Sequence, residues 1–275
     1  MTVTRRFLPA DPADFLRSAV PLGLLMAAAL VPSWRLAILA LLAVGTAIAI
    51  GRAAPVRWTW AAAVPVGLSL AWEAWPPPSP GDSGAACADP ASMVALWRVG
   101  QAVVVLGVLV ALALVLGAGR SSLALRMPAR RHVRWAAIGF LVTGPVALVL
   151  GPLLARPFVG PIDYDLTIVG AIVPAVLFAA ANGLMAEVTY RGGLLFWSAR
   201  VIGLGPALVG QAVVFGLAHS GPDVVGYPLF VMVALGTGGL IAGAIAVRTR
   251  SLLIPIAIHI GLDLPLYYGL ACAHR

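Results

Sequence analysis

Long apolar runs, separated by short polar segments, make up most of the chain. Runs such as AVVVLGVLVALALVLGAG (102–119) are apolar on every face, unlike the alternating strands of a membrane barrel. A helix needs about 20 residues to cross a bilayer. Runs of suitable length lie at 16–32, 34–50, 57–74, 92–118, 133–155, 166–186, 204–219, 225–247 and 252–271. The pattern predicts an all-α polytopic transmembrane bundle of 8–9 helices.

Two features leave the helix count open. Only Ser33 to Arg35 separate the first two runs, and the 204–219 run is short for a full crossing. A further apolar stretch at 190–199 either extends the sixth helix or lies along the interface.

The first 20 residues lack a short apolar core followed by a small-residue cleavage site, so we expect the first transmembrane helix to direct insertion.

Composition supports a bilayer as the solvent. Hydrophobic residues make up 61% of the 275 and charged residues only 10%, with a mean hydropathy of +1.00. The net charge is +8 and all 18 basic residues are Arg. They stand between apolar runs, where they act as topology signals and contact lipid headgroups, so we expect membrane lipids as partners and no nucleic acid.

The distribution of charge predicts the orientation. If the helices alternate, one side carries Arg52, Arg57, Arg120, Arg126, Arg130, Arg131, Arg134, Arg200, Arg248 and Arg250. The opposite loops carry Glu73, Asp82, Asp89, Asp163, Asp165 and Asp223. The positive-inside rule then makes the N-terminus cytoplasmic, and we expect an integral protein of a bacterial cell membrane.

The Pro- and Gly-rich loop WPPPSPGDSGAACADP (75–90) divides the chain. Residues 1–90 form N-terminal transmembrane helices and an outer loop, whereas residues 91–275 carry the candidate chemistry. Cys87 in this loop and Cys272 near the outer end of the last helix could form a disulfide, or both could stay unpaired.

Ionisable residues inside the second part need an explanation, because each costs about 2.5–3.5 kcal/mol in the hydrocarbon. Glu187 and Arg191 are four residues apart and share a helix face. His259 and Asp263 have the same spacing, so the carboxylate of Asp263 can accept a hydrogen bond from the imidazole. His219 ends the sequence FGLAH. Each motif alone has a structural explanation: an ion pair between helices for the first, an interfacial histidine for His219. Together they predict a site.

Other polar and small residues have structural explanations. His132 belongs to the Arg cluster and His274 is terminal, so neither joins the site. Gly236, Gly239 and Gly243 have the spacing of close helix packing. Tryptophans near the helix ends resemble an interfacial belt: Trp34, Trp58, Trp60, Trp72, Trp75, Trp97 and Trp135.

Three ordered motifs are similar to those of the CPBP intramembrane proteases, the CAAX-protease and bacteriocin-processing or Abi family that includes type II CAAX prenyl endopeptidases. The family has two adjacent glutamates, three residues and Arg; then Phe, three residues and His; then His, three residues and Asn or Asp. This chain has AEVTYRGG (186–193), FGLAHS (215–220) and SLLIPIAIHIGLD (251–263). The resemblance covers about residues 166–265.

One departure concerns the first glutamate of the family, its general base, where this chain has Ala186. Alanine cannot accept a proton, so the resemblance implies a protease site that is inactive or nearly so. Either the residue was substituted deliberately or the chain is a natural member without the base. We favour substitution, because every other motif position is intact.

The resemblance also implies roles for the other residues. A glutamate at 186, helped by His219, would activate water, while His259 and Asp263 would orient or stabilise the oxyanion. Glu187 and Arg191 would support this centre, and Arg191 could instead orient a substrate carboxylate. Glu187, His219 and His259 could hold a divalent ion such as zinc, although the spacing is not HExxH.

Three functions follow from these expectations. The first is an intramembrane endopeptidase acting on a membrane-associated peptide, prenylated or bacteriocin-like. The second is a non-catalytic member of the family: a scaffold, an immunity protein or a binder of lipid or peptide. The third, a transporter or channel, would explain buried charge as well, but the sequence shows no internal repeat.

Overall fold

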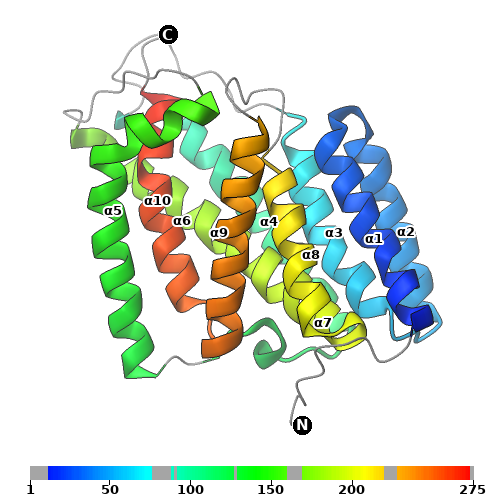
Figure 1. Cartoon of the computed structure of the whole chain (residues 1–275). Coiled ribbons are helices and arrows are strands. Elements are labelled where there is room, and N and C mark those ends of the chain that lie inside the picture. The colour runs from blue at the N-terminus through cyan, green and yellow to red at the C-terminus, as the bar shows by residue number, and fades with distance from the viewer. Residues whose placement is uncertain are drawn as a thin grey trace.

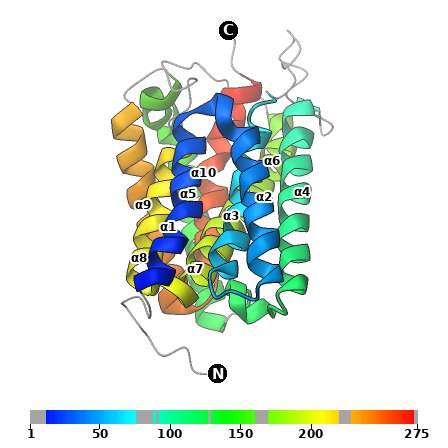
Figure 2. The same ribbon diagram turned by 90° about the vertical axis from the view of Figure 1, so that its right-hand side faces the viewer.

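The computed structural model describes residues 12–75, 88–89, 92–126, 129–159, 169–219 and 228–272, with side chains omitted at 152, 154–159 and 228. Long helices run side by side and alternate in direction, and the start of α1 and the end of α10 lie at opposite ends of the bundle (Figures 1 and 2). The helices are α1 (Pro12–Leu30), α2 (Arg35–Gly51), α3 (Arg57–Trp72), α4 (Met93–Val115), α5 (Arg130–Val159), α6 (Ile172–Ala186), α7 (Phe196–Ile202), α8 (Leu204–Leu217), α9 (Pro228–Thr249) and α10 (Leu253–Ala271).

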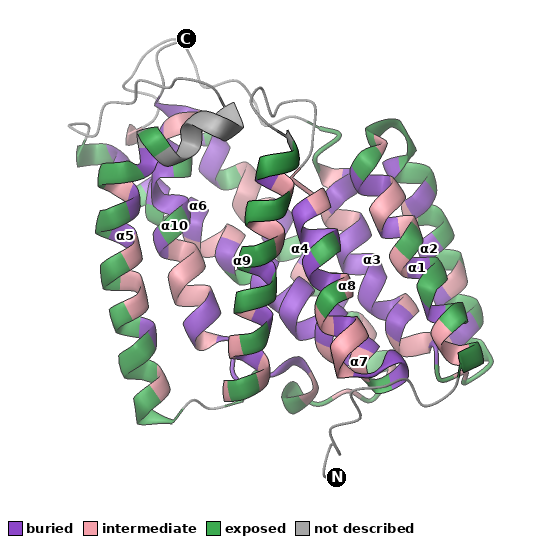
Figure 3. Ribbon diagram, viewed as in Figure 1, coloured by how far each residue is buried: buried purple, intermediate pink, exposed green. Residues whose placement is uncertain are grey.

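Seven helical segments in the described ranges are long and apolar enough to cross a membrane. Helices α3 and α8, with 16 and 14 residues, are shorter than these. Apolar side chains cover the outside of the bundle, for example Val149, 74% exposed on α5 (Figure 3). Exposed valine and leucine along whole helices suit contact with lipid. The prediction of an all-α polytopic bundle is confirmed, and the chain is an integral membrane protein.

The sixth crossing is one unbroken helical rod with a widened centre. Helix α6 leads into a π-helix, η5 (Glu187–Leu195), which leads into α7. The apolar stretch at 190–199 therefore extends the sixth helix, one of the two predicted alternatives. All nine residues of η5 are buried. π-Turns are rare and often occur at functional sites.

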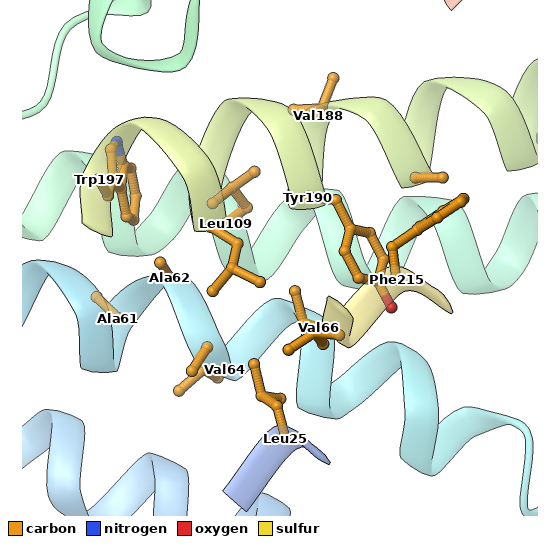
Figure 4. Close-up of a cluster of buried hydrophobic side chains, with 14 of the residues drawn as sticks. Leu25, Ala61, Ala62, Val64, Val66, Leu109, Val188, Tyr190, Trp197 and Phe215 are labelled. Atoms are coloured by element: carbon orange, nitrogen blue, oxygen red, sulfur yellow. The ribbon is translucent and has the colours of Figure 1, made fainter. Parts of the chain in front are cut away.

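The largest cluster of buried apolar side chains joins the two parts of the sequence. Leu25 and Ala62 from the N-terminal helices lie with Leu109 of α4 and with Val188 and Trp197 of the central rod (Figure 4). The division at residue 90 thus separates two stretches of sequence that share one core. In this way the N-terminal helices hold the rod in place.

Glycines allow α8 and α9 to approach closely, as their spacing predicts. A Cβ at Gly216 would lie 2.4 Å from the carbonyl oxygen of Met232, and one at Gly243 would lie 2.6 Å from Leu208. Gly239 faces Phe215 and Arg191, where a Cβ would lie 3.1 Å from the ring. The expectation of close packing at this stripe is confirmed.

The predicted arginine-rich side is one end of the bundle. Arg52 follows α2, Arg57 begins α3, Arg120 lies after α4 and Arg130 begins α5, all at the end where α1 starts (Figure 1). Of the opposite charges, Asp82, Asp163, Asp165 and Asp223 lie outside the described residues.

Cys272 is buried and disulfide-bonded, while Cys87 and His274 also lie outside the described residues.

Candidate active site

A buried ion pair opens the π-helix. Glu187 and Arg191 have side chains that are each 2% exposed, and the Nη1 of Arg191 lies 3.1 Å from the Oε1 of Glu187. The spacing of four residues places both on one face of the rod, as predicted. Arg191 is sealed inside the bundle, where its guanidinium faces Glu187; whether it orients Glu187 or a substrate carboxylate stays a prediction.

Glu187 also binds the histidine of the last helix, His259. The Nδ1 of His259 on α10 lies 2.8 Å from the same Oε1 and donates a hydrogen bond to it. The sequence predicted Asp263 as the partner of this imidazole. Instead, the Nε2 of His259 lies 3.5 Å from the Oδ2 of Asp263, which is ion-pair distance but too long for a good hydrogen bond. Glu187 is therefore the closer partner, because α6 and α10 touch at this level.

The helix contact that brings them together depends on Gly183. A Cβ at Gly183 would lie 3.2 Å from the backbone nitrogen of Ile260 and 3.5 Å from the Cβ of His259. Residues 182, 183, 186 and 187 form one stripe at helical spacing across the end of α6 and the start of η5. This stripe, which includes Ala186, faces the α10 residues of the site.

Asn182 is a site residue that the sequence analysis missed. Its Nδ2 donates a hydrogen bond of 2.8 Å to the Oδ2 of Asp263. A polar amide one turn before Ala186 in an apolar helix was the available signal, since a buried amide needs a partner. Asn182 and Asp263 thus continue the series of polar contacts that runs from Arg191 through Glu187 to His259.

Phe215 packs against most of the charged groups. The guanidinium of Arg191 lies 4.1 Å from its ring centroid, close enough for a cation–π contact. The rings of His219 and His259 lie 4.8 and 6.2 Å from the same centroid, and Tyr190 lies 5.1 Å away. Figure 4 shows Tyr190 and Phe215 edge to face. The motif phenylalanine thus brings both histidines to one site.

His219 follows the end of α8 and its tautomer is set by the backbone. The Nδ1 of His219 donates a hydrogen bond of 2.7 Å to the carbonyl oxygen of Phe215. In the neutral ring Nε2 then carries the lone pair and can accept a proton. The side chain is half-buried. His219 is consequently suited to accept a proton from a bound group and return it.

The predicted metal ligands do not form a metal-binding arrangement. Within the described residues, no group of three or more His, Cys, Asp or Glu side chains is placed to hold an ion. The Oε1 of Glu187 accepts from His259 and faces Arg191, and the Nδ1 of His219 is used by the backbone. These donors do not fit zinc, which takes four ligands arranged around it. A divalent ion stays a prediction from sequence.

Three atoms of the buried pair lack a hydrogen bond among the described residues. The Oε2 of Glu187 and the Nε of Arg191 are inaccessible to solvent and have no partner among the described residues. The Nη1 of Arg191 lies 3.1 Å from the Oε1 of Glu187, so the two groups make a charge contact without a hydrogen bond. Buried polar atoms without a partner are rare in proteins and need an explanation, and a functional site is one such explanation.

The fold and the site define a class of protein: an integral membrane protein with a polar centre enclosed by helices. Residues 168–265 match the family model described as Type II CAAX prenyl endopeptidase Rce1-like. This segment contains Glu187, Arg191, His219, His259 and Asp263. This segment is therefore similar to the family, and the resemblance to the CPBP proteases is confirmed over these residues. No curated protein and no solved structure matches the chain.

Proposed function

We propose that the chain is an intramembrane endopeptidase of the CAAX-protease type, hydrolysing a peptide bond in a membrane-associated, lipidated or bacteriocin-like substrate. The observation that supports this most is the unbroken set of contacts from Arg191 to Asn182, with His219 held beside it by Phe215. Such a set can place a water and a carbonyl group next to proton acceptors and donors.

The residues have separate roles in this proposal. His219 moves a proton through Nε2, while His259 helps to orient the substrate or to stabilise its carbonyl oxygen. Glu187 and Arg191 hold His259 in place. Because position 186 bears a methyl group in place of a carboxylate, the route through that position is closed, and we expect hydrolysis to be inactive or nearly so in this form.

Restoring the base tests the proposal. Ala186→Glu should raise the rate of peptide cleavage by about 10²–10⁴-fold, the usual contribution of a positioned general base. Ala186→Gln is the matched control, since it has the same shape and cannot accept the proton. Purified proteins are incubated in detergent or liposomes with prenylated and unmodified peptides, and products are measured by mass spectrometry. Equal rates for the two variants would count against the endopeptidase.

The second candidate is a non-catalytic member of the family that binds peptide or lipid. Ala186 itself favours it, because the position is 8% exposed and offers no group for chemistry. It predicts that the chain binds labelled peptide and that Ala186→Glu binds it equally without cleaving. Both candidate functions include the proposal that the protein lies in a bacterial cell membrane with its N-terminus on the cytoplasmic side.

A further inference from the structure

Two carboxylates remain in the centre, and they differ in what they can reach. The Oε1 of Glu187 already faces both His259 and Arg191, and its Oε2 is sealed from solvent. Its side chain is 2% exposed, against 10% for Asp263. A general base must contact the water that it deprotonates. Of the two carboxylates, Asp263 is the more exposed and Glu187 is the more fully enclosed.

Asp263 lies close to the part of α6 that carries position 186, where the family has its general base. Asn182 donates to one oxygen of Asp263, Oδ2, and lies one helical turn before Ala186 on the same stripe of α6. The Asp263 carboxylate thus lies against the face of α6 that carries position 186. The Nε2 of His259, 3.5 Å from Oδ2, adds a favourable charge contact without a tight hydrogen bond.

We propose that Asp263 is the proton-accepting carboxylate of this chain in place of residue 186, with Asn182 as the residue that positions it. The inference rests on the proposed function. In this inference, the slow hydrolysis expected of the chain with Ala186 uses Asp263 as its base. The site then has its carboxylate on α10, where the resemblance alone implies an oxyanion-stabilising group.

The chemical step consumes one water. A carboxylate oxygen of Asp263 takes a proton from water, the water oxygen bonds to the peptide carbonyl carbon, and the C=O π pair moves onto the carbonyl oxygen. When the C=O bond reforms, the C–N bond breaks and the nitrogen takes the proton from the Asp263 carboxyl group. The products are a carboxylic acid and an amine, and Asp263 is again a carboxylate.

Four proteins test this assignment: the chain itself, Asp263→Asn, Ala186→Glu and the double variant. We expect Asp263→Asn to lower the slow rate of the chain by about tenfold or more, to the level of buffer. In the Ala186→Glu background the same substitution should cause a loss about ten times smaller, because the glutamate introduced at position 186 then accepts the proton. Asp14→Asn, an equal change at a distant ion pair with Arg17, should leave the rate unchanged.

Three outcomes separate the inference from the proposed function. Cleavage by the double variant with none by the chain itself overturns the role of Asp263 and leaves the endopeptidase standing. An equal loss in both backgrounds also overturns it, because it marks Asp263 as a structural residue. No cleavage by any of the four proteins overturns the endopeptidase and this inference together. Partial recovery by Asp263→Glu would support the carboxylate role.

Discussion

Glu187 is the residue on which most contacts of the centre converge. Its Oε1 faces a guanidinium and accepts from an imidazole, and both partners lie inside the bundle. Removing one member of a buried pair leaves the other charge uncompensated, which costs more than the pair contributes when it is intact. Glu187 therefore matters for folding as well as for the site.

We predict that Glu187→Ala lowers the free energy of unfolding by about 3–5 kcal/mol. The control is Asp14→Ala, which breaks the pair between Asp14 and Arg17, whose side chain is 70% exposed. That loss should stay at about 1 kcal/mol or less. Chemical unfolding of both variants in one detergent measures the difference, and equal losses would contradict a buried pair.

Helix α10 depends on a close contact with α5 at the level of the site. Gly261, between His259 and Asp263, lies against Thr143 and Gly144 of α5. Pro265 follows within the same helix and cannot donate the hydrogen bond to residue 261. Packing against α5 consequently determines where α10 holds its two polar side chains.

We predict that Gly261→Ala destabilises the protein by about 1–3 kcal/mol, the usual range for overpacking. The added Cβ would lie 2.2 Å from the Oγ1 of Thr143 and 2.9 Å from the backbone nitrogen of Gly144, which cannot move freely. Gly238→Ala on α9 is the control, because no atom of the described residues lies within 4 Å of its added Cβ. If thermal unfolding gave the same midpoint for both variants, the close α5–α10 contact would be wrong.

The end of the bundle where α1 starts carries most of the described arginines, which predicts the orientation of the molecule. The start of α1 and the end of α10 lie at opposite ends of the bundle (Figure 1). Positively charged loops stay on the cytoplasmic side. The two ends of the chain should therefore face opposite sides of the membrane.

Reporter fusions in a bacterial host check this orientation. Alkaline phosphatase fused after Arg275 should be active and green fluorescent protein fused there should be dark. Fusions after Arg250, at the arginine-rich end, should give the reverse pattern. Equal behaviour of the two fusion sites would refute the predicted alternation of the last helix.

Much of the fold followed from local patterns, because a helix in lipid satisfies its own backbone hydrogen bonds and needs only an apolar surface. Runs of apolar residues therefore identified nearly every helix. The spacing of four residues identified the Glu187–Arg191 pair on one face. Asn182 was missed although a polar amide one turn before Ala186 was a visible signal, and the π-helix has no periodic signature in a single sequence.

By itself, the sequence determined the membrane class, the helices and the motif residues, because these depend on side-chain polarity and on spacing within one segment. Only the tertiary structure decided which groups meet. It paired His259 with Glu187, joined Asn182 to Asp263 and placed both histidines around Phe215. These contacts depend on how closely α6, α8 and α10 approach, and that distance is set by glycines and by packing between helices distant in sequence.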